Sequence, residues 1–414
     1  MARSPHPPVD PARDAAALLR RVGFFGLFVI MPVAAQYARR AVVVMAPIAI
    51  ALLVLASVID GKARAVRPAS TRLLRSSAFL AGCLFLLWAA LSLVWTPFLD
   101  VATERVLNLV ATLLMTMAGY LALPDRMRSA NLYLLPVGLA AAAIVAIGLG
   151  LSGHGLFGER LVRPGDDDIL DRGLILLVLL VWPGVAWLRS RGRDAEALGL
   201  AVLVSVALIV SPGPTTLVAL AVGALAFALT AARPVLGPRI LATTAALLLV
   251  LGPALPFVAR PIGAWLFGGR SPGVLSLKTW QAIVTAEPLR LITGHGFETA
   301  LQGRFVGLLP MNAPRTLLFE LWYELGLVGA FAAAFALRAA ILRAGREVSV
   351  LVPGAMAAFA AAFLIACIGV GMMVMWWITT LVLAVLVFVA VERGQFRTRR
   401  PKASLLRPRP ANDA

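Results

Sequence analysis

The sequence is poor in charge and in cysteine. Only 14% of its 414 residues are charged, 60% are hydrophobic, and the mean hydropathy is +0.90. No soluble domain of this size has such a composition, so we expect an all-α, polytopic membrane protein. The two cysteines, Cys83 and Cys367, both lie in apolar runs. They indicate core packing and exclude a disulfide framework or a cysteine metal site.

Several familiar motifs are missing as well. The start of the chain, MARSPHPPVDPARD, has no charged region followed by a small-residue cleavage site. We therefore expect the first spanning helix to act as its own insertion signal. The chain has no phosphate-binding glycine loop, no HExxH and no paired aspartates of a metal-dependent sugar-nucleotide transferase. We expect no metal and no cofactor.

Twelve segments are candidates for spanning helices, since a span needs about 20 mostly apolar residues. They divide the chain into nine spans within 1–257, a long loop at 258–314, three spans within 315–391, and a basic tail at 392–414 that is expected to be disordered. The expected spans are 22–37, 41–59, 76–95, 101–123, 131–151, 172–188, 196–211, 215–231, 239–257, 315–337, 350–368 and 372–391.

The basic residues predict the orientation of these spans. Asp and Glu number 20 against 38 Lys and Arg, which gives a net charge of +18. About two thirds of the Lys and Arg fall in short loops on one side and in the two ends of the chain, as in cytoplasmic segments. We therefore expect both termini in the cytoplasm. The positive charge then requires no nucleic-acid partner.

Two outer loops are longer than a connection requires. The first, residues 152–171, holds His154 between two glycines and an acidic run before Arg172. Arg172 either pairs with Asp171, anchors the helix end, or binds an anion.

The second long loop, residues 258–314, is basic. Its arginines and lysine either contact lipid headgroups or bind an anionic ligand, because a guanidinium matches phosphate oxygens. An apolar repeat at helical spacing within it predicts a short amphipathic helix on the membrane surface or over a cavity. The basic residues are Arg260, Arg270, Lys278, Arg290, Arg304 and, at the end, Arg315; the apolar repeat is Leu277, Trp280, Ile283 and Val284.

The segment after this loop carries charge into a spanning helix. Asn312 is expected to cap that helix and Pro314 to occupy its first turn. Arg315 then lies at the outer mouth of the helix. Charged side chains cost about 2.5–3.5 kcal/mol at the centre of a spanning helix and less near its end, so they are functional candidates.

Thr316, Glu320 and Glu324 follow at intervals of four residues, which places them on one helix face. Glu324 lies deepest and should face the protein interior, either in a structural pair or in a site of chemistry. Gly326 and Gly329 are expected to permit close helix contact below it. His295, flanked by glycines in the loop, is either a general base or an ordinary turn residue.

Two stretches resemble a known family. They are TWQAIVTAEPLRLITGHGFETA at 279–300 and NAPRTLLFELWYELGLVGA at 312–330, with SPGPTTLVALAVGALAF at 211–227 as a weaker third. The pattern resembles the C-terminal signature of the O-antigen ligase and O-antigen polymerase superfamily, with a long outer loop between two late helices. The resemblance covers roughly residues 160–335.

The chain departs from the ligases at one position. The residue nine places before Glu324 is a histidine in the ligases, and here it is Arg315. Arg315 followed by ten residues and Gly326 is instead similar to a pattern described for some polymerases.

The resemblance implies transfer of a glycan from an undecaprenyl diphosphate carrier to an acceptor sugar, at the outer face of the bacterial inner membrane. Arg315 and the basic residues Arg172, Arg270, Lys278, Arg290 and Arg304 would bind the donor diphosphate, without a metal. Glu320 or Glu324, or His295, would orient or deprotonate the acceptor hydroxyl.

A polysaccharide polymerase is the leading expectation, and three others remain open. One is a ligase that joins glycan to a lipid A-core acceptor with an altered base. Another is a secondary transporter, against which stand the long basic loop and the lack of paired broken helices in the sequence. The last is a purely structural membrane partner.

Overall fold

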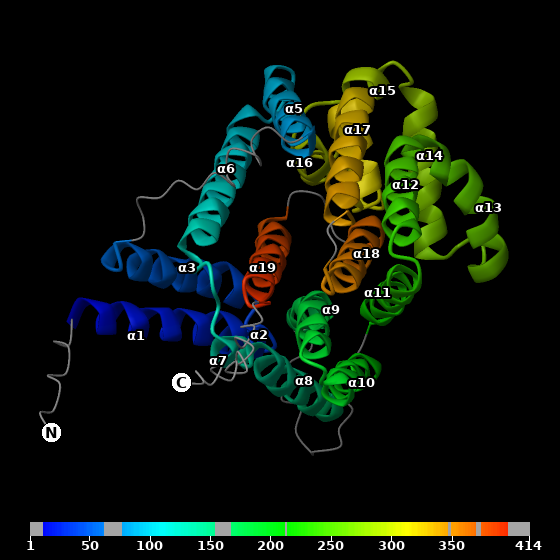
Figure 1. Ribbon diagram of the computed structural model, residues 1–414. Helices are drawn as coiled ribbons and strands as arrows, with labels where there is room; N and C mark the ends of the chain where they lie inside the picture. Colours follow the sequence, from blue (N-terminus) through cyan, green and yellow to red (C-terminus); the bar gives the residue numbers. More distant parts are fainter. Residues whose placement is uncertain are drawn as a thin grey trace, which may run out of the picture.

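The computed structural model describes residues 11–61, 77–153, 167–211, 213–346, 349–369 and 374–395. These residues form helices and turns, with no strand among them (Figure 1). His154 and nearly all of the basic tail at 392–414 lie outside the described residues. The elements are α1 (Pro11–Phe25), the π-helical turn η1 (Gly26–Ile30), α2 (Met31–Ala34), α3 (Ala41–Ile59), α5 (Ser77–Leu91), η3 (Ser92–Val94), α6 (Leu99–Ala122), α7 (Ser129–Leu132), α8 (Leu134–Gly153), α9 (Asp167–Ser190), α10 (Asp194–Val210), α11 (Pro214–Ala232), α12 (Leu236–Val250), η4 (Gly252–Ala254), α13 (Leu255–Phe267), α14 (Pro272–Ala286), α15 (Arg290–Thr293), α16 (Thr299–Phe305), α17 (Leu317–Ala344), α18 (Val352–Ile368) and α19 (Met375–Glu392).

Every expected span coincides with a helix, but not every helix is long enough to span. In the described residues, eight helices are long and apolar enough to cross a membrane, or nine if the bent pair α12–α13 forms one span. The chain is therefore a multi-pass membrane protein. The expected count of twelve is not confirmed, because α5, α10 and α18 have 15, 17 and 17 residues, short of the about 20 that a bilayer requires.

Helix α9 is the centre of the larger hydrophobic core. Its side chains from Gly173 to Leu188 are all buried, against α8, α10, α18 and α19. A helix that is apolar on all sides is stable only when other helices surround it. The second core joins α5, α12, α14 and α17, and it positions the candidate site.

Helix α17 is broken at Gly326. This residue has φ 61° and ψ −157°, so the helical hydrogen-bond ladder is interrupted there. The carbonyls just before the break accept hydrogen bonds from other elements instead. Tyr323 O accepts from His295 N at 2.8 Å, Glu324 O from Gly296 N at 3.0 Å, and Leu325 O from Trp88 Nε1 of α5 at 2.9 Å.

The break depends on a backbone-to-backbone contact between two glycines. A Cβ added to Gly326 would lie 2.6 Å from Gly294 N, and one added to Gly294 would lie 2.2 Å from Glu324 O. Both residues have positive φ, which L side chains rarely adopt. Gly326 therefore permits close contact as expected, but its partners are Ile292 in α15 and Gly294 directly after α15, and the helical conformation of α17 is interrupted there.

A second break lies beside the first. Helix α12 and the segment Gly252–Phe267 meet at a bend of 67°. Trp322 Nε1 of α17 donates to Leu249 O at 2.7 Å, just before that bend. The two broken helices run alongside each other (Figure 1) and are joined at their breaks. This corrects the sequence-based expectation that paired broken helices are lacking.

The long basic segment is largely helical. It forms α13 to α16, and the helix expected around Leu277–Val284 is α14. The Trp280 ring of α14 meets Phe319 of α17 edge to face, with centroids 5.7 Å apart. Trp280 is buried in this contact, so the apolar face of α14 packs over the start of α17.

The glycine contact yields a direct stability test. Replacing Gly326 by Ala forces a side chain into the loop backbone at a positive φ, and should lower the free energy of unfolding by about 2 kcal/mol or more. Thermal unfolding of the purified protein in detergent micelles measures the change. Gly199→Ala in α10 is the control, because nothing lies within 4 Å of a Cβ there. Equal melting temperatures for both variants would contradict the prediction.

Candidate functional site at the start of helix α17

Thr316 begins helix α17. Its Oγ1 accepts from Phe319 N at 3.3 Å, and the helix starts at Leu317. The expectation that Asn312 caps the helix was wrong, because the buried turn at Ala313 and Pro314 separates Asn312 from the first helical residue. Asn312 is exposed, and its carbonyl accepts from Ser276 Oγ of α14 at 2.7 Å.

Arg304 lies buried behind this turn. Its side chain is 1% exposed, its Nη2 donates to Pro314 O, and the same Nη2 lies 4.0 Å from Glu320 Oε1. Burial lowers the pKa of the guanidinium, Glu320 opposes that shift, and the nearby charge of Arg315 adds to it. Its Nε and Nη1 make no hydrogen bond to other described residues. Arg304 thus fixes the peptide group that precedes Arg315. The residue Arg315 is itself exposed.

The two glutamates of α17 face inward, towards α16. Glu320 and Glu324 are 7% and 4% exposed. Glu324 Oε1 accepts from Ala300 N at 3.1 Å, in the first turn of α16. The expected interior position of Glu324 is therefore observed, and the carboxylate has a specific structural partner.

A third buried acid was not among the sequence-based candidates. Glu298 is 2% exposed, has a left-handed φ of 67°, and its Oε1 lies 3.3 Å from Arg105 Nε of α6. Burial raises the pKa of Glu298 above its ordinary value of 4.5, and Arg105 opposes the shift. Glu298 and Arg105 are far apart in the chain, so no local pattern could have paired them.

The charged residues around α16 and the start of α17 form one charge cluster, which holds three acids and three arginines. Glu298, Glu320, Glu324 and Arg304 are buried, Arg105 is partly exposed, and Arg315 is exposed. Burying ions costs several kcal/mol each unless opposite charges and hydrogen bonds compensate. The formal charges cancel when all six groups are ionised. The α16–α17 charge cluster is Arg105, Glu298, Arg304, Arg315, Glu320 and Glu324.

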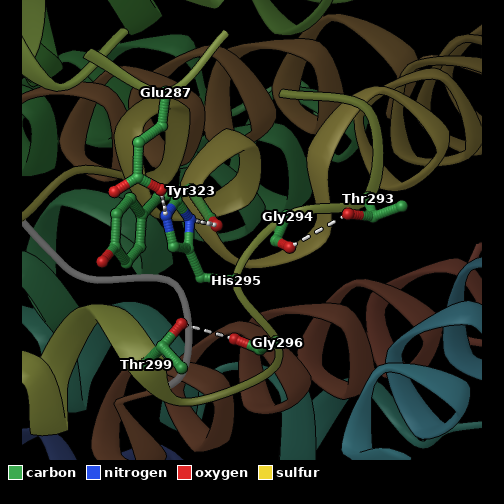
Figure 2. A network of polar contacts seen from close by, with 7 residues as sticks. All are labelled: Glu287, Thr293, Gly294, His295, Gly296, Thr299 and Tyr323. Atoms are coloured by element: carbon green, nitrogen blue, oxygen red, sulfur yellow. Dashed lines mark hydrogen bonds and ion pairs between the residues drawn. The ribbon is translucent and has the colours of Figure 1, made fainter. Parts of the chain in front are cut away.

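His295 connects the loop to the break in α17 (Figure 2). Its Nδ1 lies 3.0 Å from Tyr323 O, its Nε2 lies 3.0 Å from Glu287 Oε2, and its ring stacks on Tyr323 with centroids 4.0 Å apart. Both partners are hydrogen-bond acceptors, so each contact is a hydrogen bond when the ring nitrogen that faces it carries the proton. While both bonds hold, neither nitrogen is open to accept a proton from a substrate.

The remaining candidates lie outside the cluster. Arg290 lines a crevice of about 20 Å³ together with Glu287 and His295. Arg270 and Lys278 are exposed and make no hydrogen bond or ion pair with other residues in the described ranges. The guanidinium carbon of Arg172 lies 5.0 Å from the Trp376 ring centroid, in a cation–π contact between α9 and α19.

Comparison with known protein families, with curated proteins and with solved structures gives no match to this chain. The family resemblance of the two late stretches therefore stays a prediction. Function has to be argued from the charge cluster, the broken helices and the membrane setting.

The charge cluster predicts that the effects of substituting Arg304 and Glu320 on protein stability are coupled. Arg304→Met leaves the buried carboxylates uncompensated and should destabilise the protein by about 3–5 kcal/mol. Adding Glu320→Gln removes one of those charges and should recover about 0.5–3 kcal/mol. Chemical unfolding of the wild type, both single variants and the double variant measures this coupling. Strictly additive effects would show that Arg304 and Glu320 do not interact.

The buried carboxyl group of Glu298 predicts that the stability of the folded protein depends on pH. Its pKa is raised on folding, so the folded state binds the proton more tightly, and stability should fall as pH rises from 4.5 through the folded pKa. Glu298→Gln removes this group and should flatten that part of the profile. Melting temperatures from pH 4 to 8, roughly the range in which carboxyl groups with raised pKa titrate, measure the difference. A steeper decline in the variant would contradict the assignment.

Proposed function

We propose that this protein transfers a glycan from a polyprenyl diphosphate carrier to an acceptor sugar at the membrane surface, as a polysaccharide polymerase. The observation that supports the proposal best is the position of Arg315. It is exposed at the head of a membrane helix, directly after a carbonyl that the buried Arg304 holds. Three buried acids and Arg304 lie behind it.

The reaction needs positive charge where the diphosphate leaves. Breaking the bond between the sugar and the phosphate places negative charge on the departing diphosphate, and a fixed guanidinium stabilises it. Arg315 serves as the donor contact because it is exposed, and Arg304 serves as its positioning residue because it is buried. Arg270, Lys278 and Arg290, exposed in the same segment, attract the donor to this face.

One of the acids would accept the proton of the acceptor hydroxyl. Glu324 is fixed by the Ala300 amide, while Glu320 lies one turn closer to Arg315 and is within 4.0 Å of Arg304. We assign the base to Glu320 and a structural role to Glu324. His295 holds the loop at the break in α17, with both ring nitrogens engaged.

An apolar groove provides a place for the carrier chain. It has a volume of about 550 Å³, lies between α5 and α17, and includes Val328, Phe331 and Phe335. These residues follow the break at Gly326, so the groove leaves room for a polyprenyl chain whose diphosphate end lies towards the charge cluster. We place the protein in the bacterial inner membrane, with both termini in the cytoplasm and the charge cluster on the outer face.

A secondary transporter is the second candidate, because two broken helices are joined at their breaks. Such helices bind substrates in transporters through freed backbone groups. Here the carbonyls of Tyr323, Glu324 and Leu325 each already accept a hydrogen bond from another element, so they are not freed groups that await an ion. This favours the transferase.

Substitution of Arg315 tests the proposal. In a strain that depends on this protein, Arg315→Ala should reduce surface polysaccharide by at least about a hundredfold while the protein stays in the membrane, as expected when a transition-state charge contact is lost. Arg343→Ala, at the opposite end of α17, is the matched control and should keep the wild-type level. Wild-type polysaccharide in the Arg315 variant would refute the proposed role.

Gel profiles of the glycan then distinguish the reactions. Loss of a polymerase leaves a single repeat unit on the acceptor, whereas loss of a ligase leaves long chains on the carrier. Uptake by purified protein in vesicles, with normal polysaccharide in the deletion strain, would favour the transporter.

A further inference from the structure

A second charged site lies at the other end of α17. A cavity of about 950 Å³ opens between the ends of α9, α11, α12, α17 and α18. Among the described residues, four arginines line it, Arg189, Arg239, Arg338 and Arg346, together with one acid, Asp194. The candidate site for glycan transfer uses none of them.

The arginines of this cavity differ in their partners. Arg189 Nε lies 3.2 Å from Asp194 Oδ1, and its guanidinium carbon lies 5.2 Å from the Phe227 ring centroid. The side chains of Arg239, Arg338 and Arg346 make no hydrogen bond or ion pair with other described residues. After Asp194 offsets Arg189, no acid among the described residues of the lining faces the other three positive charges.

The wall of the cavity also holds an unpartnered hydroxyl. Thr230 of α11 lines the cavity and is 1% exposed, and its Oγ1 makes no hydrogen bond in the described part of the chain. A buried hydroxyl without a partner is unfavourable, and a bound hydrogen-bond acceptor would supply that partner. Apolar side chains, among them Phe227 and Leu342, form much of the remaining wall.

We propose that this cavity binds a phosphate group, carried either by an anionic lipid or by a soluble phosphate compound. Guanidinium groups present several donors in a plane that matches phosphate oxygens. Basic pockets between membrane helices on the cytoplasmic side bind phospholipid headgroups in the same way. The mixed lining, basic with apolar walls, suits a phosphate attached to a hydrocarbon portion.

Basic residues on this face would also follow from membrane topology alone. The difference lies in position: topology requires only that the charges be on this side, whereas a site requires that they face one cavity. Arg233, directly after α11, and Arg343, in the last turn of α17, are exposed but do not line the cavity. They provide a control with the same change in charge.

The test uses the purified full-length protein in a non-ionic detergent. Binding is measured by microscale thermophoresis at 150 mM salt with short-chain phosphatidic acid, short-chain phosphatidylcholine and inorganic pyrophosphate. The variant is Arg239→Gln with Arg338→Gln, and the control is Arg233→Gln with Arg343→Gln. All four side chains are exposed, so neither double variant removes a core contact.

We expect the wild type and the control to bind phosphatidic acid, and the cavity variant to bind it about tenfold more weakly or worse, since two charge-assisted contacts are lost. Binding of phosphatidic acid without pyrophosphate identifies a lipid phosphate, and binding of both identifies the phosphate group itself. Equal weakening in both double variants, or no preference over phosphatidylcholine, would overturn the proposal.

Protein stability gives an independent measurement. A ligand that binds only the folded state raises its melting temperature in proportion to the logarithm of the ligand concentration. Phosphatidic acid should raise the melting temperature of the wild type and the control, and leave that of the cavity variant unchanged. An identical rise in all three proteins would place binding elsewhere on the surface.

Discussion

The interrupted hydrogen-bond ladder of α17 is the constraint on which the site depends. In a membrane, each backbone carbonyl without a hydrogen-bond partner costs several kcal/mol. A helix can therefore be interrupted only where other groups donate hydrogen bonds to the freed carbonyls. Here the loop amides of His295 and Gly296 and the indole of Trp88 pair with the carbonyls before Gly326. Three elements distant in sequence are thereby held at one point.

This anchoring explains how a basic segment remains over the mouth of a membrane helix. The loop at the break leads directly into α16, and α16 brings Arg304 against Pro314 and Ala300 against Glu324. The charge cluster is thus a consequence of the broken helix. Its charges compensate one another inside the protein, while Arg315 remains at the surface where an anionic donor could reach it.

Helix α17 also relates the two proposed sites. The charge cluster surrounds its first turns, and the basic cavity includes Arg338 near its last turns. The first site combines acids with arginines, as proton transfer beside a diphosphate requires. In the described part of the chain, the second is lined by four arginines and one acid, which suits binding of an anion without chemistry. The difference in charge balance, and not the number of arginines, separates their proposed roles.

The sequence by itself determined the membrane class, the positions of the helices and the inward-facing Glu324, because hydropathy and a spacing of four residues are local properties of the chain. It also indicated α14 through an apolar repeat. The cap at Thr316, the break at Gly326 and the pairing of Arg105 with Glu298 depended on contacts between distant segments. The cavity at the far end of α17 likewise needed five helices to assemble. Only the tertiary structure could decide these features, since a buried charge or a freed carbonyl is stable only with partners that no local pattern specifies.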